Sequence, residues 1–401
     1  MSEKVLNRWS IAVAGVIIQL CLGTIYGWSV FTKPLMAQFG WTQTQATLPF
    51  TIAIGVLAIA TITGGTWLDK KGPKIVATVG TIMFSIGIIL TGFAIHVGSL
   101  TLLYLTYGVI GGLGLGLGYI TPIATLVKWF PDKRGLITGI AVMGFGLGAL
   151  MMTFIAPFMI VLLGISTTFY IFGTIFLVLL AIASQFLVEP PKGWTPVGWA
   201  IPTTGVAASG MNLQEAVKTK FFWLLWGMLF VNITAGIALI SQASPMAQEI
   251  VGLTAAQAGV LLGIMSVFNG MGRLFWSGFS DRLGRRNVFL ILFATQAIVF
   301  LILPSVTTVI PFAIISCYIL FCYGGGLATM PAFTADVFGT KNVGTIYGWL
   351  LTSWSAAGVV GPMFFAYIRQ AYQGYSQALY ITGIALIIAL ILPYLAKQSP
   401  E

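Results

Sequence analysis

Arg273 is the residue whose surroundings point most directly to chemistry. It lies in NGMGRLFWSGFSDRLGRR (269–286), where the next charged residue along the chain is Asp281. In a helix their separation of eight positions corresponds to about 12 Å. A guanidinium stays charged in any protein environment, and inside an apolar segment it needs an anion. Its planar N–H donors can bind a carboxylate through two parallel hydrogen bonds.

The acidic residues do not supply that anion at the same depth. All of them fall at the end of an apolar segment, in a loop or in a tail: Glu3, Asp69, Asp132, Glu189, Glu215, Glu249, Asp281, Asp336 and Glu401. We therefore expect Arg273 to hold the carboxylate of a small ligand. Asn269 lies one helical turn earlier on the same face and can orient that ligand, although it cannot titrate. The alternative is a helix that ends near Gly272, with Arg273 reaching water.

The sequence lacks the motifs for nucleotide binding, metal binding and nucleophilic catalysis. The chain has no Walker A motif, no Cys/His metal spacing and no Ser–His–Asp set, and His96 is its sole histidine. The glycine string GLGLGLG (112–118) lies within an apolar run, where glycines favour close helix packing over nucleotide binding. The sequence therefore predicts neither an enzyme nor a site for a cofactor or metal.

The elements that must position Arg273 are membrane-spanning helices. Hydrophobic residues make up 58% of the 401 residues and charged residues only 7%, whereas a soluble domain carries about 25% charged residues. The apolar runs are continuous and long enough to cross a hydrocarbon core of about 30 Å. We count twelve: 9–32, 44–68, 75–96, 100–127, 135–163, 166–188, 221–247, 255–280, 287–306, 309–337, 342–371 and 374–396.

The net charge of +10 follows the expected topology and does not indicate nucleic acid. With the N-terminus inside, only Lys33 and Arg369 lie outside and Arg273 lies within a span, so 19 − 3 = 16 basic residues are internal. The positive-inside rule then predicts that both termini are cytoplasmic.

The chain also reads as a duplicated six-helix unit. DKKGPK (69–74) is repeated as DRLGRR (281–286), an offset of 281 − 69 = 212, and further matches follow in the same order. The halves are expected at 1–188 and 221–401, parallel and joined by a cytoplasmic linker at 189–220. Within that linker, NLQE (212–215) resembles a helix-capping box. The repeat places Arg273 opposite Thr61 (273 − 212 = 61), where the apolar run continues, which favours the intramembrane position.

Twelve spans, parallel halves and a DxxG motif with basic residues in two equivalent loops resemble the major facilitator superfamily over essentially the whole chain. Arg273, PDKRG (131–135) and KFFWLLW (220–226) resemble its oxalate/formate antiporter and monocarboxylate transporter group. The resemblance implies alternating access to a central anion site in which Arg273 holds the carboxylate. It also implies cytoplasmic gate contacts made by Asp69 and Asp281 with neighbouring bases such as Arg282.

Two departures from that group bear on the cargo. Proton-coupled members usually have an aspartate where this chain has Asn269, and oxalate carriers have a lysine in helix 11. The corresponding stretch here, LLTSWSAAGVVGP (350–362), has no basic residue. One cation suits a monoanion better than a dianion, which would leave net charge in a low-dielectric site.

The remaining lining is expected from aromatic and phenolic side chains. Tyr119 and Tyr323 can donate hydrogen bonds to a carboxylate or hydroxyl. Four further residues could form an apolar wall that limits cargo size, although packing is an equal alternative for each: Tyr26, Trp28, Phe145 and Trp354.

The sequence thus predicts a plasma-membrane carrier for a small monocarboxylate of the L-lactate or pyruvate type, with proton coupling as the resemblance implies. Anion exchange, for example of oxalate against formate, is the first alternative. A channel or a non-transporting sensor on the same scaffold is the second. Beyond the lipid bilayer and the carboxylate, no obligate protein partner is expected.

Overall fold

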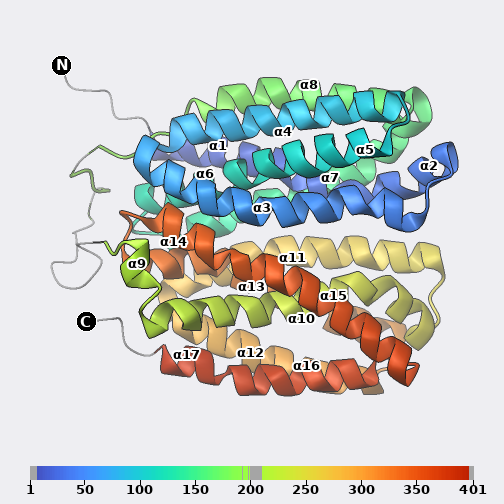
Figure 1. The fold of residues 1–401 in the computed structure, drawn as a ribbon. Helices are drawn as coiled ribbons and strands as arrows, with labels where there is room; N and C mark the ends of the chain where they lie inside the picture. Colours follow the sequence, from blue (N-terminus) through green and yellow to red (C-terminus); the bar gives the residue numbers. More distant parts are fainter. Residues whose placement is uncertain (1–6, 192, 197, 199–209, 397–401) are drawn as a thin grey trace. The chain divides into compact units, whose positions relative to one another are not determined.

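A computed structural model describes residues 7–191, 193–196, 198 and 210–396, and the regular elements in these ranges are all helices (Figure 1). The first half of the chain forms α1 (Arg8–Gly23), η1 (Thr24–Trp28), α2 (Ser29–Phe39), α3 (Gln43–Lys71), α4 (Pro73–His96), α5 (Leu100–Leu103), η2 (Tyr104–Gly111), α6 (Gly112–Trp129), α7 (Arg134–Leu163) and α8 (Ile165–Ser184). The second half forms α9 (Leu213–Ala216), α10 (Lys220–Val251), α11 (Ala255–Leu283), α12 (Arg285–Ile302), η4 (Leu303–Ser305), α13 (Val309–Phe338), α14 (Val343–Leu350), α15 (Thr352–Tyr372), α16 (Ser376–Ala389) and α17 (Ile391–Leu395).

Twelve continuous helical stretches within the described ranges are long and apolar enough to cross a membrane, which confirms the expected count. The largest difference is in the first, which runs over Arg8–Phe39 instead of ending at 32. Lys33 and Pro34 signal a helix end in the sequence, but the helix continues past both. It stops at Gly40, whose φ of 68° is left-handed and whose N–H bonds to the Met36 carbonyl.

Equivalent helix ends in the two halves are built alike, which supports the internal repeat. Thr42 and Gln45 form a capping box before α3, and Thr254 and Gln257 form the same box before α11, at an offset of 254 − 42 = 212. The glycine of each DxxG motif, Gly72 and Gly284, has a φ of 83°. An L side chain rarely adopts that conformation, so the turn requires glycine.

The predicted capping box in the linker is also confirmed. The Asn212 side chain accepts from the Glu215 N–H, and the Glu215 side chain accepts from the Asn212 N–H, each at 2.9 Å. Much of the rest of the expected linker lies outside the described residues.

The chain separates into two compact units whose make-up differs from a simple division in the linker. The first comprises residues 1–132, 141–201 and 340–349, and the second comprises 133–140, 202–339 and 350–401. Each therefore includes a short segment that belongs by sequence to the other half. These segments contain the starts of α7 and α14. The boundaries 1–188 and 221–401 stay a prediction about the two halves.

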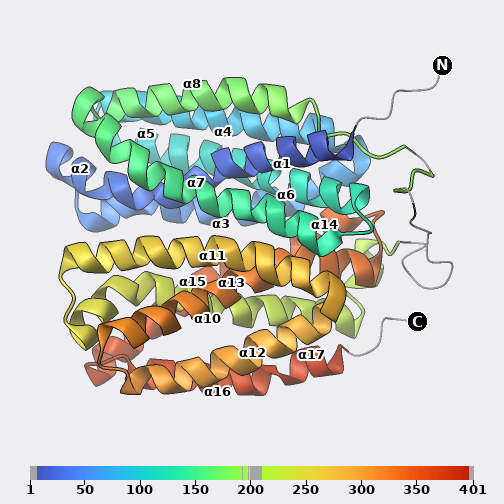
Figure 2. The same ribbon diagram turned by 180° about the vertical axis from the view of Figure 1, so that it is seen from behind.

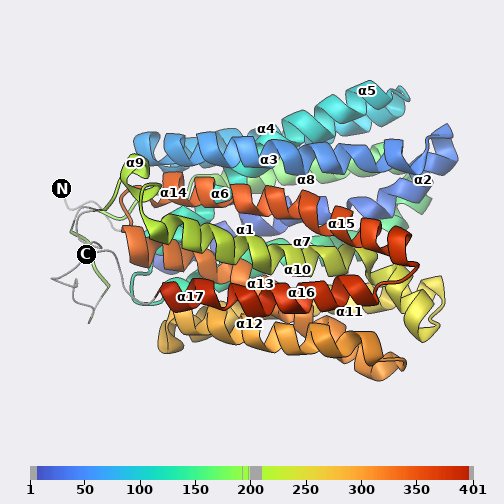
Figure 3. The ribbon, with the colours of Figure 1, turned by 60° about the horizontal axis from the view of Figure 1, so that its bottom comes forward.

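Within the first unit, α4 packs against α8 and α6, and α3 packs against α6 (Figures 1 and 2). Within the second, α11 packs along α13, α10 contacts α13 and α15, and α12 lies beside α16 (Figure 3). In both units the fourth span of the half, α6 or α13, is among the most deeply buried helices. These two helices carry Tyr119 and Tyr323.

Candidate functional site

Arg273 lies well inside α11, because that helix continues for another 283 − 273 = 10 residues, to Leu283. Its exposed fraction is 1%. The alternative in which the helix ends near Gly272 and the side chain reaches water is therefore wrong. A permanent positive charge sits inside a spanning helix, where it is costly unless it is stabilised.

Asn269 contacts the guanidinium, as the shared helical face predicts. Arg273 Nε donates to Asn269 Oδ1 at 3.2 Å. Because Nε belongs to the guanidinium plane, this bond restricts the orientation of the whole group. Asn269 thus acts on the placement of the cation whether or not it also contacts a ligand.

Three consecutive glycines in α13 allow this helix to approach α11 and α10 closely. A Cβ on Gly324 would overlap Asn269 and press on Arg273 Cγ, one on Gly325 would overlap Trp276, and one on Gly326 would overlap the Asn232 amide. Glycines in a spanning helix favour close packing of the neighbouring helices. At these positions they provide room for three large side chains.

The same close approach of α13 to its neighbours determines where Tyr323 lies. It precedes the glycine run in α13, is 2% exposed, and interacts electrostatically with Arg273. Its ring lies against Gly236 of α10, where a Cβ would overlap it. The second unit therefore brings three of the predicted ligand-binding residues together: Arg273, Asn269 and Tyr323.

The first unit brings two of the four predicted wall residues, Tyr26 and Phe145, together with Tyr119. The Phe145 ring makes edge contacts with Tyr26 and Tyr119, with ring centroids 5.2 and 5.3 Å apart. Phe50, from α3, adds a ring 6.0 Å from Tyr26. Tyr119 and Phe145 are fully buried. Sequence reasoning did not find Phe50, because a single phenylalanine in an apolar run carries no distinguishing signal.

Trp28 packs against other partners within the first unit, and Trp354 belongs to the second unit. Trp28 packs on Tyr107 with ring centroids 4.1 Å apart, and its Nε1 donates to the Ala46 carbonyl at 2.8 Å, an arrangement typical of a packing residue. Trp354 is buried in α15. A role in lining the ligand site stays a prediction for both residues.

The two DxxG carboxylates cap helices that come from the other half of the sequence. Asp281 accepts from the N–H groups of Gly135 and Leu136 at the start of α7, both at 2.8 Å. Asp69 accepts from the N–H and hydroxyl of Thr345 at the start of α14, at 2.7 and 2.8 Å. A carboxylate at a helix N-terminus satisfies unpaired donors and interacts favourably with the helix dipole.

The base that pairs with Asp281 is Arg285, and a gating role for Arg282 stays a prediction. Arg285 pairs with Asp281 at 2.6 Å and with Asp336 at 3.0 Å, and Asp336 also pairs with Arg134 at 2.6 Å. Arg285 stands four residues after Asp281, and the i, i+4 spacing puts it within reach, whereas the adjacent Arg282 is exposed. Asp336 and Arg134 were missed because their pairing joins distant parts of the sequence.

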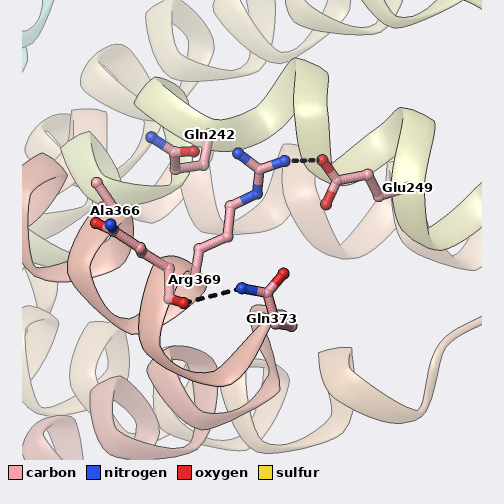
Figure 4. Close-up of a pocket in the computed structure, with 6 residues that line it drawn as sticks. Gln242, Glu249, Ala366, Arg369 and Gln373 are labelled. Atoms are coloured by element: carbon pink, nitrogen blue, oxygen red, sulfur yellow. Dashed lines mark hydrogen bonds and ion pairs between the residues drawn. The ribbon is translucent and has the colours of Figure 1, made fainter.

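Each acid in the described ranges has a polar or basic partner near its own end of a span. Besides the aspartates above, Asp132 pairs with Arg8, Glu189 with Lys128, Glu215 with the Asn212 N–H, and Glu249 with Arg369. The Arg369–Glu249 pair borders a polar pocket of about 540 Å³ between α10 and α15, which Gln242, Gln370 and Gln373 also line (Figure 4). The Arg369 side chain is 46% exposed there, in contrast to Arg273.

The fold and these motifs define a member of a transporter family. The profile of the Major Facilitator Superfamily matches residues 15–249 and 233–401, and the chain belongs to that family. The fucose:proton symporter of Escherichia coli has the same fold, with a TM-score of 0.73 over 97% of this chain and all of that one, at 14% identity. The protein is accordingly a multi-pass membrane transporter and not an enzyme.

Sequence relatives span nearly the full length. An uncharacterised MFS-type transporter of E. coli, YhjX, is 30% identical and covers 85% of this chain and 83% of its own. The oxalate:formate antiporter of Oxalobacter formigenes is 28% identical, with 96% and 90% covered. Apicoplast pyruvate carrier 1 of Toxoplasma gondii is 24% identical, with 96% and 87% covered.

Proposed function

We propose that this transporter carries a small monocarboxylate, of the L-lactate or pyruvate type, across the plasma membrane by alternating access and in symport with a proton. The observation that carries the proposal is Arg273, a guanidinium that is 1% exposed inside a spanning helix and oriented by Asn269. A carboxylate both neutralises such a group and matches its planar donors. A pyruvate carrier among the relatives adds support.

The charge of the site favours a monoanion. The part of helix 11 where oxalate carriers of the group place a lysine reads LLTSWSAAGVVGP here. A single guanidinium leaves a bound monocarboxylate neutral overall, whereas a dicarboxylate would keep one negative charge out of water. Phe145 with Tyr26 and Tyr119 would limit the length of the cargo.

The second candidate is anion exchange of the oxalate/formate type. It is favoured by the oxalate:formate antiporter among the relatives and by Asn269, which cannot carry a proton where proton-coupled members of the group have an aspartate. In an exchanger, a second anion resets the empty site and no titrating group is needed.

Uptake of labelled C1–C4 carboxylates into proteoliposomes separates the candidates. Symport predicts accumulation of a monocarboxylate driven by an inward proton gradient with no internal substrate. Exchange predicts uptake that requires internal counter-substrate and is indifferent to pH. Failure of every carboxylate in both formats would overturn both candidates and indicate another cargo.

The capped DxxG carboxylates fit a gate in this scheme. Asp69 and Asp281 would hold the starts of α14 and α7 in one state and release them in the other. With both termini in the cytoplasm, as the charge distribution predicts, these contacts belong to the cytoplasmic side.

A further inference from the structure

Each half carries, on its first long helix, an amide side chain followed four residues later by a glycine. In the first half these are Gln19 and Gly23 of α1; in the second they are Asn232 and Gly236 of α10, at a constant offset of 232 − 19 = 213. Both amides are fully buried. A residue pair that recurs within one residue of the DxxG offset of 212, in two otherwise diverged helices, is a candidate for a shared role.

In the second half, this pair fixes Tyr323 at two points. Asn232 Nδ2 donates to the backbone carbonyl of Tyr323 at 3.0 Å, and one helical turn further Gly236 accommodates the Tyr323 ring. Gln296 of α12 donates to Asn232 Oδ1 at 3.3 Å. That bond directs the amide nitrogen, and not the oxygen, at the tyrosine carbonyl.

In the first half, the same pair acts on Tyr119. Gln19 Nε2 donates to the backbone carbonyl of Tyr119 at 2.9 Å. Gly23 lets the backbone of Phe145 approach closely, and the Phe145 ring makes its edge contact with the Tyr119 ring. In the first half, Phe145 therefore lies between the glycine and the Tyr119 ring. In the second half, the Tyr323 ring lies directly against the glycine.

We propose that Gln19/Gly23 and Asn232/Gly236 are positioning residues that set the height and direction of the cargo-facing tyrosine in each half. The amide holds the tyrosine backbone, and the glycine sets the surface against which its ring rests. Unlike a binding residue, none of the four needs to contact the cargo. This inference rests on the proposed function, because it assigns Tyr119 and Tyr323 to the carboxylate site.

The first test is a spectroscopic readout that does not depend on transport. The full chain carries 3-fluorotyrosine at position 323, and its ¹⁹F resonance is compared in Asn232→Ala, Gly236→Ala and a control, Thr234→Ala. Thr234 lies on the same helix, and its hydroxyl donates to the carbonyl of Phe230 one turn earlier in that helix. We expect both positioning variants to shift the resonance and the control to leave it in place.

The second test is a double-mutant cycle on carboxylate uptake. Asn232→Ala should raise the half-saturation concentration about two- to tenfold, the equivalent of one neutral hydrogen bond, with little change in maximal rate. On a Tyr323→Phe background the same substitution should have a much smaller effect, because the hydroxyl it would misplace is already gone. Gln19→Leu and Tyr119→Phe form the matching cycle in the first half.

The outcomes separate the two proposals. If the wild type takes up no carboxylate, the proposed function is wrong, and the ¹⁹F comparison still decides whether these residues position Tyr323. If uptake is normal but the resonance stays unchanged in both variants, or the effects in the cycle are fully additive, the positioning role is overturned and the proposed function stands. Should Asn232→Ala fail to fold, Gly236→Ala and Gln19→Leu carry the same test.

Discussion

Two arginines in the spanning helices of the second unit differ in their exposure and in the groups that they contact. The Arg369 side chain is 46% exposed and pairs with Glu249, so its charge is balanced at the surface. Arg273 is 1% exposed and is oriented by an uncharged amide. Arg273 is therefore the residue through which we expect the carboxylate of the proposed cargo to bind, because hydrogen bonds between a guanidinium and a carboxylate are strong.

Arg273→Lys should nearly abolish carboxylate uptake while leaving the protein folded. A lysine keeps the charge but loses the planar donors and the Nε bond to Asn269, which predicts a loss of roughly 10- to 100-fold or more, since hydrogen bonds to charged groups contribute about 1.5–3 kcal/mol. Initial uptake rates and a melting curve measure both effects. The matched control is Arg369→Lys, and equal activity of the two variants would remove Arg273 from the site.

Asn269→Asp should make uptake depend more strongly on pH. When ionised, the new carboxylate would neutralise Arg273 and compete with the cargo, and protonation would release the guanidinium. Uptake should therefore rise as the pH falls. Asn287→Asp, an exposed change in the same unit, serves as control. A pH profile identical to that of the wild type would exclude the assigned role of Asn269.

Among individual residues, the sequence allowed prediction of the charged site residue and its immediate neighbour. Arg273 stands out because charges are rare in apolar runs, and Asn269 follows from it by helical spacing. Gln19, Asn232 and Gln296 were missed because an uncharged amide in an apolar helix has many ordinary explanations. The offset of 213 between Gln19 and Asn232, one residue from that of the DxxG motifs, is the signal that could have identified two of them.

Among the elements, α13 shows how local sequence controls helix approach. Gly324, Gly325 and Gly326 face Asn269, Trp276 and Asn232 in turn, so one short run of residues without side chains determines three contacts. In a lipid environment, where apolar burial contributes little to helix association, such close approach is a main source of packing energy.

Gly325→Ala should destabilise the protein by about 1–3 kcal/mol, because its Cβ would overlap the Trp276 ring and force the helices apart. Gly263→Ala is the matched control, since a Cβ there meets nothing within 4 Å. That control should be neutral or stabilising by up to about 1 kcal/mol through helix propensity. Melting temperatures in detergent give the comparison, and a neutral Gly325→Ala would contradict this account of α13.

The spanning helices themselves were predicted closely, because the length of an apolar run follows directly from the thickness of the hydrocarbon core. The predicted ends of the helices differed more from the structure, most of all in the first helix. The first helix extends to Phe39 because the residue that ends it is Gly40, whose backbone is left-handed. The contacts between helices could not be predicted, because they depend on which faces meet.

For the whole molecule, the internal repeat predicts equivalent tasks for Asp69 and Asp281. Both cap a helix start whose glycines, Gly135 and Gly344, are aligned by the repeat at an offset of 344 − 135 = 209. The motifs and their equivalence were visible in the sequence. The helix that each carboxylate caps was not, because it comes from the other half.

Asp281→Asn should lower stability by about 0.5–2 kcal/mol, because an amide cannot accept from both N–H groups with the strength of a carboxylate and leaves Arg285 with one fewer anion. If this contact is a gate, the maximal rate of uptake should change as well. Glu189→Gln, which removes the more exposed carboxylate beside Lys128, should do neither. Equal behaviour of the two variants would argue that Asp281 is an ordinary surface acid.

The topology can be checked with introduced thiols. Cys21, Cys317 and Cys322 are all buried, so the wild-type background should be low. In intact cells a membrane-impermeant maleimide should label Lys33→Cys, and should label Lys341→Cys only after permeabilisation. The reverse pattern would invert the orientation derived from the charge distribution.

Residues 133–140 group with the second unit, and residues 340–349 group with the first. This grouping matters for an experiment in which the two halves are produced as separate polypeptides. Two polypeptides produced by cutting within the linker would each lack a piece that completes their own bundle, and each would carry the piece that the other lacks. Co-production of the fragments should therefore rescue both from degradation, whereas neither should accumulate when made by itself.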